Sequence, residues 1–216
     1  MKSFLVIGLG RFGKHLAMRL MELGNEVLVI DKDEDSINKI SPFVTQAMIG
    51  DCMDADVLRS LGVSNFDVCF VCISDYFQSS LEITSLLDEL GAKRIVSKAD
   101  REIHEKFLLK VGADEVISPE KDMAGRAAVK YSMKNAYDYF ELSPEYAIME
   151  MQVPDSWVGK SIAELRVSSR YNVVIIGGKG NNKVTPIINT SYTFNRGEHI
   201  VVAGRKIDII RLNEKA

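Results

Sequence analysis

Short hydrophobic runs alternate with amphipathic stretches along the first 120 residues. The runs have the length of buried strands, and the stretches between them carry apolar residues at helical spacing. A glycine ends most of these stretches, as expected where a helix stops. Alternation of this kind predicts an α/β fold with a Rossmann-like, doubly wound parallel sheet. The six predicted strands are residues 4–7, 27–30, 45–49, 68–73, 94–97 and 115–117.

The pattern changes beyond residue 120. One helix is predicted over residues 121–136, and shorter strand-like segments follow it. Glycine and asparagine over residues 177–182 predict a turn between two of these strands. The sequence therefore predicts a nucleotide-binding domain over 1–120, a linker helix over 121–136 and a small α+β domain over 137–216.

A glycine motif joins the first predicted strand to the first predicted helix. Gly8 allows a tight turn, Gly10 lets the backbone approach a phosphate, and Gly13 lets the helix pack closely on the strand. Free N–H groups at the helix start favour an anion there. Asp31 follows at the end of the second strand, where a carboxylate can accept from ribose hydroxyls. The motif predicts an adenine nucleotide with a free 2′-hydroxyl and leaves NAD(H), ATP and ADP open.

Other polar residues follow the carboxyl ends of the predicted strands. Asp51, Ser74, Lys98 and Glu120 occupy such positions. Because these ends meet at one edge of a parallel sheet, we expect the four residues to surround one crevice with the glycine motif. For Asp51, capping of the following helix is an equal alternative.

Composition limits the function classes. A hydrophobic content of 46% over 216 residues suits packed domains, and the net charge of −3 argues against general nucleic-acid binding. The longest apolar runs are too short for a transmembrane helix, and the first residues lead into a strand rather than a signal peptide.

Cys69 and Cys72 have the spacing of a redox or zinc pair. A strand, however, places these two positions on opposite faces. We therefore expect core cysteines in a reducing cytoplasm.

The order of motifs resembles the regulatory subunits of bacterial potassium transporters of the Ktr and Trk type, the KtrA/KtrC-like family. The resemblance covers nearly the whole chain. It implies an RCK nucleotide-binding domain followed by an RCK_C (TrkA-C) domain. The segments that carry it are residues 7–13, 29–31, 98, 112–123, 157–165 and 197–204.

The resemblance also implies site roles. Arg11 and Lys98 would meet the terminal phosphates of ATP, with Arg11 supplied by the same or a neighbouring chain. Glu120 would help to hold a cation such as Mg²⁺, Ca²⁺ or Na⁺. Chemistry supports the phosphate role of Arg11, because its position in the motif points toward the phosphates and a guanidinium can donate two hydrogen bonds to one phosphate. The alternatives are an exposed helix-start residue for Arg11 and a helix-dipole acid for Glu120. Phe12 and Lys32 complete the predicted nucleotide contacts.

In this family the C-terminal domain often binds cyclic di-AMP at a dimer interface. The corresponding stretch here offers a cation, an amide and apolar side chains, and a plain hydrophobic dimer contact is the alternative. The candidate residues are Arg170, Tyr171, Asn172, Val173, Ile175 and Pro186.

The sequence thus predicts a ligand-gated regulator rather than an enzyme. By resemblance it would form homodimers that assemble into a tetramer or an octameric ring, and would gate a membrane K⁺-translocating subunit of the KtrB, KtrD or TrkH kind from the cytoplasmic face. The alternatives are an NAD(H)-binding sensor of the Trk type and an NAD-dependent oxidoreductase. The oxidoreductase lacks support because none of His15, His104 and His199 stands in a recognisable catalytic motif.

Overall fold

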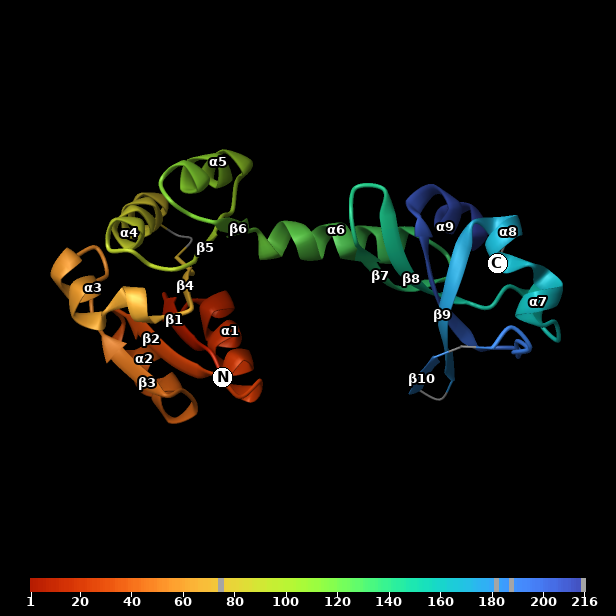
Figure 1. The fold of residues 1–216 in the computed structure, drawn as a ribbon, viewed down its shortest axis with the longest axis horizontal. Coiled ribbons are helices and arrows are strands. Elements are labelled where there is room, and N and C mark those ends of the chain that lie inside the picture. Colours follow the sequence, from red (N-terminus) through yellow and green to blue (C-terminus); the bar gives the residue numbers. More distant parts are fainter. Residues whose placement is uncertain (74–75, 181–182, 187–188, 215–216) are drawn as a thin grey trace. The chain divides into compact units, whose positions relative to one another are not determined.

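The computed structural model describes residues 1–73, 76–180, 183–186 and 189–214 (Figure 1). The chain divides into two units, which we call unit 1 (Met1–Lys121) and unit 2 (Asp122–Ala216). Among the described helices, none has the length and apolar character needed to span a membrane.

Unit 1 contains a six-stranded parallel sheet in the order β3-β2-β1-β4-β5-β6. This order confirms the predicted doubly wound fold. Successive strands are added outward from β1 to β3 on one side and from β4 to β6 on the other, so the strand order reverses between β1 and β4. The strands are β1 (Ser3–Ile7), β2 (Glu26–Asp31), β3 (Gln46–Ile49), β4 (Val68–Val71), β5 (Ile95–Lys98) and β6 (Glu115–Ile117). The helices are α1 (Arg11–Glu22), α2 (Glu34–Ile40), α3 (Ala55–Leu61), α4 (Phe77–Glu89) and α5 (Glu102–Lys110).

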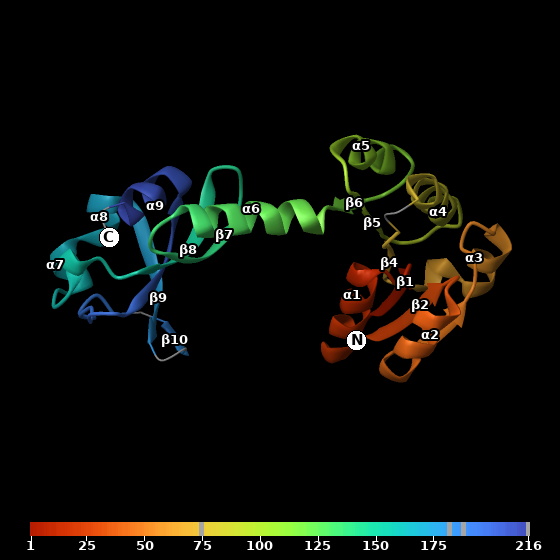
Figure 2. The ribbon, with the colours of Figure 1, turned by 180° about the vertical axis from the view of Figure 1, so that it is seen from behind.

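Alternate residues of β1 enter two separate hydrophobic cores, because successive side chains of a strand point to opposite faces. Phe4 and Val6 pack with residues of α1 and α2. Leu5 and Ile7 pack with residues of α3 and α4 on the other face. Figure 2 shows α2 beside β2, and α2 also packs against β3. Within the described part of unit 1, helices therefore cover both faces of the sheet around β1, and the strand ends remain open to a ligand.

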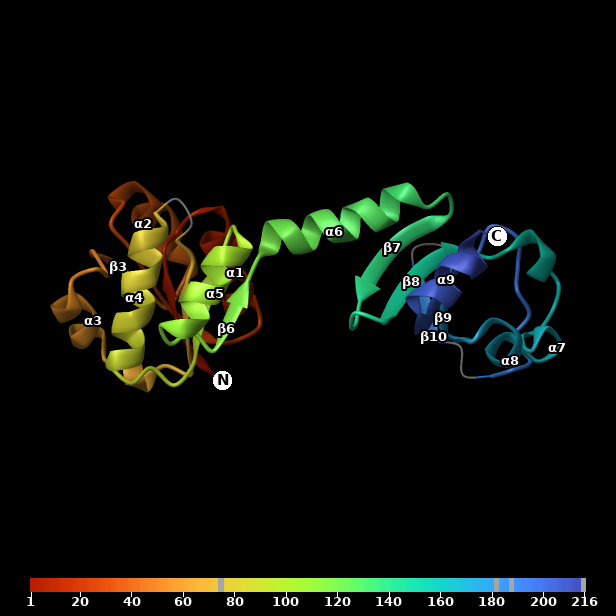
Figure 3. The ribbon, with the colours of Figure 1, turned by 90° about the horizontal axis from the view of Figure 1, so that it is seen from above.

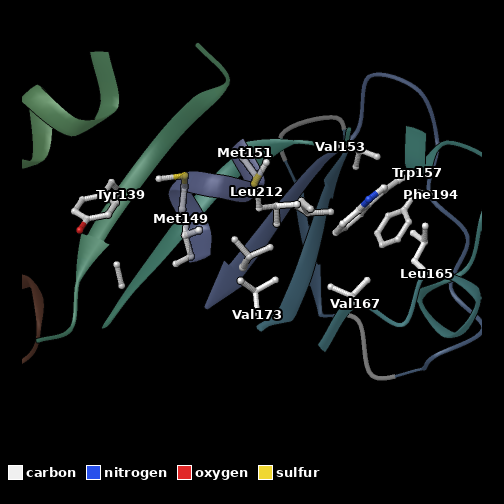
Figure 4. Close-up of a cluster of buried hydrophobic side chains, with 14 residues drawn as sticks. Tyr139, Met149, Met151, Val153, Trp157, Leu165, Val167, Val173, Phe194 and Leu212 are labelled. Atoms are coloured by element: carbon white, nitrogen blue, oxygen red, sulfur yellow. The ribbon is translucent and has the colours of Figure 1, made fainter. Parts of the chain in front are cut away.

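Unit 2 contains a five-stranded antiparallel sheet in the order β10-β9-β11-β8-β7. Helix α9 packs on β8 and β11 (Figure 3). The core beneath the sheet is built around Trp157, Phe194 and the alternate residues Met149 and Met151 of β8 (Figure 4). The elements are β7 (Ala136–Glu141), β8 (Tyr146–Gln152), β9 (Val173–Gly180), β10 (Lys183–Pro186), β11 (His199–Arg205), α7 (Ile162–Leu165), α8 (Val167–Tyr171) and α9 (Lys206–Asn213).

Helix α6 spans Pro119–Ser132, so it begins and ends earlier than the predicted helix over 121–136. Proline is favoured at the first helical position, because its fixed φ suits a helix and its missing N–H is not needed there. At the other end, β7 begins at Ala136 and pairs with β8, which excludes a helical conformation for that residue.

The predicted turn over 177–182 is wrong at its start, because β9 continues to Gly180. Gly177 and Gly178 pair with Val201 and Ile200 of β11, just beyond a register shift in the ladder. Glycine is common inside strands next to a bulge, and a bulge cannot be recognised from the local composition alone. Residues 181–182 lie outside the described residues.

An ionic cluster lies across four strands of unit 2. Glu150 on β8 accepts hydrogen bonds from Lys179 Nζ at 2.9 and 3.0 Å, and its Oε1 lies 3.0 Å from His199 Nδ1. The ring of Tyr137, at a second register shift, stacks on His199 with centroids 3.8 Å apart. His199 therefore has an acidic partner that the sequence analysis did not find, and the partner belongs to a structural cluster.

We expect Glu150→Gln to destabilise unit 2 by about 2 kcal/mol at pH 7, because Lys179 and His199 would lose a charged acceptor. Burial alone would raise the pKa of Glu150, but hydrogen bonds from His199 and Lys179 outweigh burial and lower it. The stabilisation is therefore complete above the unfolded pKa of about 4.3 and is lost as the pH falls through the lower folded pKa. Urea unfolding of both proteins between pH 7 and pH 3 should show the difference shrinking. The exposed Glu145→Gln is the control, and a difference independent of pH would contradict the ionic account.

Candidate nucleotide-binding site

The chain turns sharply between β1 and α1. Gly8 has a φ of +92° and donates from its N–H to the carbonyl oxygen of Ile30 at 2.9 Å. A Cβ at Gly13 would lie 2.0 Å from the carbonyl oxygen of Gly8. The turn and the first helical turn thus approach each other to a distance that only glycine permits at position 13. Gly10 differs, because an added Cβ would meet no atom within 4 Å.

Asp31 is fixed against this turn at the end of β2. Its Oδ2 accepts from the Leu9 N–H at 2.5 Å, and its Oδ1 accepts from the Asp33 N–H at 2.9 Å. Each carboxylate oxygen has a second lone-pair direction. The carboxylate is therefore oriented by the protein and can still accept from a ligand.

One cavity adjoins Asp31. This Asp31 cavity has a volume of about 210 Å³ and is lined mainly by the ends of β1, β2 and β4 and the residues that follow β3. Lys32 lies in its wall with Nζ 5.3 Å from the ring centre of Tyr76. Apart from its isoleucines and Cys72, the cavity is lined by Gly8, Gly10, Asp31, Lys32, Gly50, Asp51, Cys52, Met53, Tyr76 and Ser79.

Asp51 lines the Asp31 cavity and also accepts from the Met53 N–H at 3.0 Å. It does not cap helix α3, because that position belongs to Asp54, whose side chain accepts from the Asp56 N–H. The capping alternative for Asp51 is therefore wrong, and its carboxylate shapes the loop that forms the cavity wall.

The second cavity adjoins Lys98 and has a volume of about 680 Å³. This Lys98 cavity shares Gly10 and Cys72 with the Asp31 cavity, so the two cavities are neighbours. Phe12 contributes an apolar side chain from α1. The charged residues that line the cavity are Arg11, Lys98, Asp100, Arg101, Glu102, Glu120 and Lys121.

Lys98 is only 7% exposed and lies between two carboxylates. Its Nζ donates to Glu120 Oε1 at 2.8 Å and lies 3.3 Å from Asp100 Oδ1. Burial alone would lower the pKa of Lys98, but the hydrogen bonds to Glu120 and Asp100 outweigh it and raise the pKa. The hydrogen bond from Lys98 lowers the pKa of Glu120, with a smaller contribution from the charge of Arg11. Both partners are charged at neutral pH, so an anionic ligand at Lys98 would compete with carboxylates.

The structure brings most of the predicted nucleotide residues together. Gly8, Asp31, Lys32 and Asp51 line the Asp31 cavity, Arg11, Phe12, Lys98 and Glu120 line the Lys98 cavity, and Gly10 lines both. Gly13 lies below them, against Gly8. Ser74 lies outside the described residues. Sequence reasoning missed Met53, Tyr76, Asp100, Arg101 and Lys121, although Asp100 and Arg101 lie only two and three residues beyond the end of β5.

The predicted cation ligand Glu120 shares the Lys98 cavity with the carboxylates of Asp100 and Glu102. Within the described residues, no three His, Cys, Asp or Glu side chains are placed to hold a metal ion. Glu120 offers one carboxylate, and Lys98 already donates to one of its oxygens.

The cysteines behave as core residues. Cys52, Cys69 and Cys72 are free and buried. Cys69 and Cys72 belong to the cores on opposite faces of the sheet, as predicted. Burial raises the pKa of each of the three thiols to about 12, so they are unreactive near neutral pH.

The second-messenger candidates of unit 2 occupy different environments. Arg170 is exposed at the end of α8, next to Tyr171, and Asn172 follows with a φ of +55°. Val173 is 1% exposed, and Ile175 packs beside it against the core of unit 2. The strand therefore presents Val174 and Ile176 at the surface instead, while Pro186 lies exposed at the end of β10.

Comparison with known families and proteins gives consistent matches. The TrkA-N domain matches residues 4–119 and the TrkA-C domain matches residues 148–216. The chain is 36% identical over 214 residues to the Ktr system potassium uptake protein C of Bacillus subtilis (strain 168), covering 99% of this chain and 97% of that protein. It is 30% identical over 203 residues to the Ktr system potassium uptake protein A of Vibrio alginolyticus, covering 94% and 92%.

Solved structures share the fold. The GsuK RCK domain has a TM-score of 0.70 at 20% identity, over 99% of this chain and 47% of that chain. The GsuK channel bound to NAD has the same TM-score and identity, over 99% of this chain and 39% of that chain. At this identity the likeness concerns the fold alone.

Proposed function

Because this chain belongs to the family of Ktr-type regulatory subunits for potassium uptake, with TrkA-N and TrkA-C domains, we propose that it is a nucleotide sensor that gates a separate K⁺-translocating membrane subunit. In this proposal the chain binds ATP and ADP in unit 1 and carries out no chemical reaction on them. It works from the cytoplasmic face, through its membrane partner.

The observation that carries this proposal is the pair of adjoining cavities at the glycine turn. The Asp31 cavity offers an oriented carboxylate for a ribose, and the Lys98 cavity offers Arg11 and Lys98 for phosphates. Gly10 lies between them with open space at its Cβ position, where a phosphate chain can approach the backbone. The arrangement favours an adenosine polyphosphate that extends from one cavity into the other.

The ATP state must differ from the ADP state by contacts of the γ-phosphate, since only differential contacts shift a two-state equilibrium. Lys98 now donates to Glu120 at 2.8 Å. A third phosphate that reaches Lys98 would replace this carboxylate and release Glu120. A Mg²⁺, Ca²⁺ or Na⁺ ion could then join Glu120 to phosphate oxygens and water, which is the usual way a single carboxylate takes part in such a site.

The wider assembly is part of the proposal. The chain would form a homodimer that assembles into a tetramer or an octameric ring. The conformational changes of its subunits would then act together on a membrane subunit of the KtrB, KtrD or TrkH kind. An NAD(H) sensor is the second candidate, because the same glycine turn and Asp31 suit any adenine dinucleotide with a free 2′-hydroxyl.

A further ligand, cyclic di-AMP, is proposed for unit 2. Arg170 is exposed beside Asn172, and Val174 and Ile176 present apolar side chains from the adjoining strand. A guanidinium next to apolar surface suits a purine dinucleotide.

Calorimetric titration of the purified chain with ATP, ADP, NADH and cyclic di-AMP tests these proposals. We expect ATP and ADP to bind and NADH to bind weakly. NADH binding far more tightly than both would instead favour the NAD(H) sensor and remove the γ-phosphate roles of Arg11 and Glu120. Hydride transfer to any substrate would refute the regulator. Loss of cyclic di-AMP binding in Arg170→Ala would support the unit 2 site.

We expect Arg11→Ala to weaken ATP binding by about tenfold more than ADP binding, because a charged hydrogen bond to the γ-phosphate is worth about 1.5 kcal/mol or more. Arg19→Ala is the matched control, since Arg19 lies on the same helix, is exposed and pairs with Glu22. Calorimetry of both variants with both nucleotides measures the ratio. Equal losses for ATP and ADP would remove Arg11 from the γ-phosphate.

A further inference from the structure

The first turn of helix α6 forms part of the wall of the Lys98 cavity. This turn carries Glu120 and Lys121, which line that cavity. Lys98 donates to Glu120 at 2.8 Å, and Lys121 donates to Glu102 at 2.7 Å. Ion pairs therefore hold the start of α6 to Lys98, which would meet a phosphate, and to Glu102 on α5. An anion at Lys98 would weaken one of these pairs and act directly on this turn.

Less than two turns later, where α6 already belongs to unit 2, the same helix is fastened to β7. Arg126 donates from Nε and Nη2 to Asp138 Oδ1 at 3.0 and 2.7 Å, and from Nη2 to Asp138 Oδ2 at 2.7 Å. Its guanidinium carbon lies 3.7 Å from the ring centre of Phe140. Forked hydrogen bonds combined with ring stacking fix the orientation of an arginine, which a lysine cannot reproduce.

This contact is attached to the core of unit 2 through β7. Asp138 Oδ1 also accepts from the Tyr139 N–H at 2.9 Å, and Tyr139 is buried in the core beside the residues of β8. Burial alone would raise the pKa of Asp138, but the hydrogen bonds from Arg126 and Tyr139 lower it. The carboxylate is therefore charged at neutral pH and holds Arg126 on a strand that cannot shift without its core neighbours.

Between these two contacts, the helical conformation of α6 is maintained by its own backbone hydrogen bonds. None of its residues is buried, and residues 120–125 are exposed. Arg126 lies about 9 Å along the helix axis from Glu120, at 1.5 Å per residue. A helix transmits a shift of one turn to the next through its backbone hydrogen bonds. Arg126 is thus placed to pass a change at Glu120 to β7.

We propose that Arg126 is a positioning residue that couples nucleotide occupancy of the Lys98 cavity to the β7–β8 sheet of unit 2. The proposal rests on the proposed function, because it requires ATP to bind in unit 1. In this proposal Arg126 does not contact the nucleotide. Its role is to convert a displacement of α6 into a change in the stability of β7.

Amide hydrogen exchange of the full chain, with and without ATP, tests the coupling. In the wild type we expect ATP to protect residues 8–13 and to change exchange in β7. In Arg126→Ala the protection at residues 8–13 persists while the change in β7 is lost. ATP affinity should shift by no more than about fivefold, the lower end of allosteric coupling. Arg126→Lys keeps the charge without the fork or the stacking and should also lose the β7 response.

Arg211→Ala is the matched control, because Arg211 is an exposed arginine of unit 2 whose guanidinium lies 4.0 Å from Asp208. It should keep the β7 response. If Arg126→Ala does not fold, the same exchange experiment is made with Arg126→Lys and Asp138→Asn. A β7 response that survives in the folded variants refutes the coupling, and so does a wild type in which ATP protects residues 8–13 alone. Absence of ATP protection at residues 8–13 would refute the proposed function, and the coupling with it.

Discussion

Gly13→Ala is expected to destabilise unit 1 by about 3 kcal/mol, because its methyl group would overlap a backbone carbonyl. The added Cβ would lie 2.0 Å from the Gly8 oxygen and 3.1 Å from Cys72 Cβ. Neither neighbour is the end of a flexible side chain, so α1 must move away from β1. Urea unfolding followed by circular dichroism measures the loss, and nucleotide binding should disappear with it.

Gly10→Ala separates binding from folding and is the matched control. Its Cβ would meet nothing within 4 Å, and its backbone φ of −59° suits any residue. We expect the free energy of unfolding to change by less than about 1 kcal/mol, within the range for substitutions that meet no steric conflict. ATP and ADP binding should nevertheless weaken, because the methyl group would lie where a phosphate approaches. A Gly13→Ala protein as stable as Gly10→Ala would contradict the described turn.

Asp31→Ala is expected to weaken ATP, ADP and NADH alike, by about 100-fold. The carboxylate would lose charged hydrogen bonds to two ribose hydroxyls, each worth about 1.5 kcal/mol or more. Its removal also frees the Leu9 N–H, which now donates to Asp31 at 2.5 Å. Calorimetric titration with the three nucleotides measures the effect.

Asp33→Ala is the neighbouring control for this result. Asp33 caps α2 by accepting from the Ser36 N–H at 3.0 Å and does not line either cavity. Its loss should cost about 1 kcal/mol of stability, the usual value of an N-cap, and leave nucleotide affinity unchanged. If Asp31→Ala bound ADP normally while losing ATP, the ribose role of Asp31 would be wrong.

The sequence by itself determined the fold of unit 1 and the position of its glycine turn. Strand and helix periods are local properties, so the six strands of unit 1 could be predicted within one or two residues. Asp31 was recognisable because its place after the second strand is also local. The core placement of Cys69 and Cys72 followed from the same alternation.

Only the tertiary structure decided which charged residues meet. Lys98 and Glu120 were expected around one crevice, but their direct hydrogen bond follows from the pairing of β5 with β6, which end at the same edge. The Glu150 cluster and the Arg126–Asp138 contact depend on antiparallel pairing and on register shifts in unit 2. The continuation of β9 through Gly177 and Gly178 has the same origin. Pairing and register are set by contacts between distant segments, and such contacts leave no periodic signal in the residues that make them.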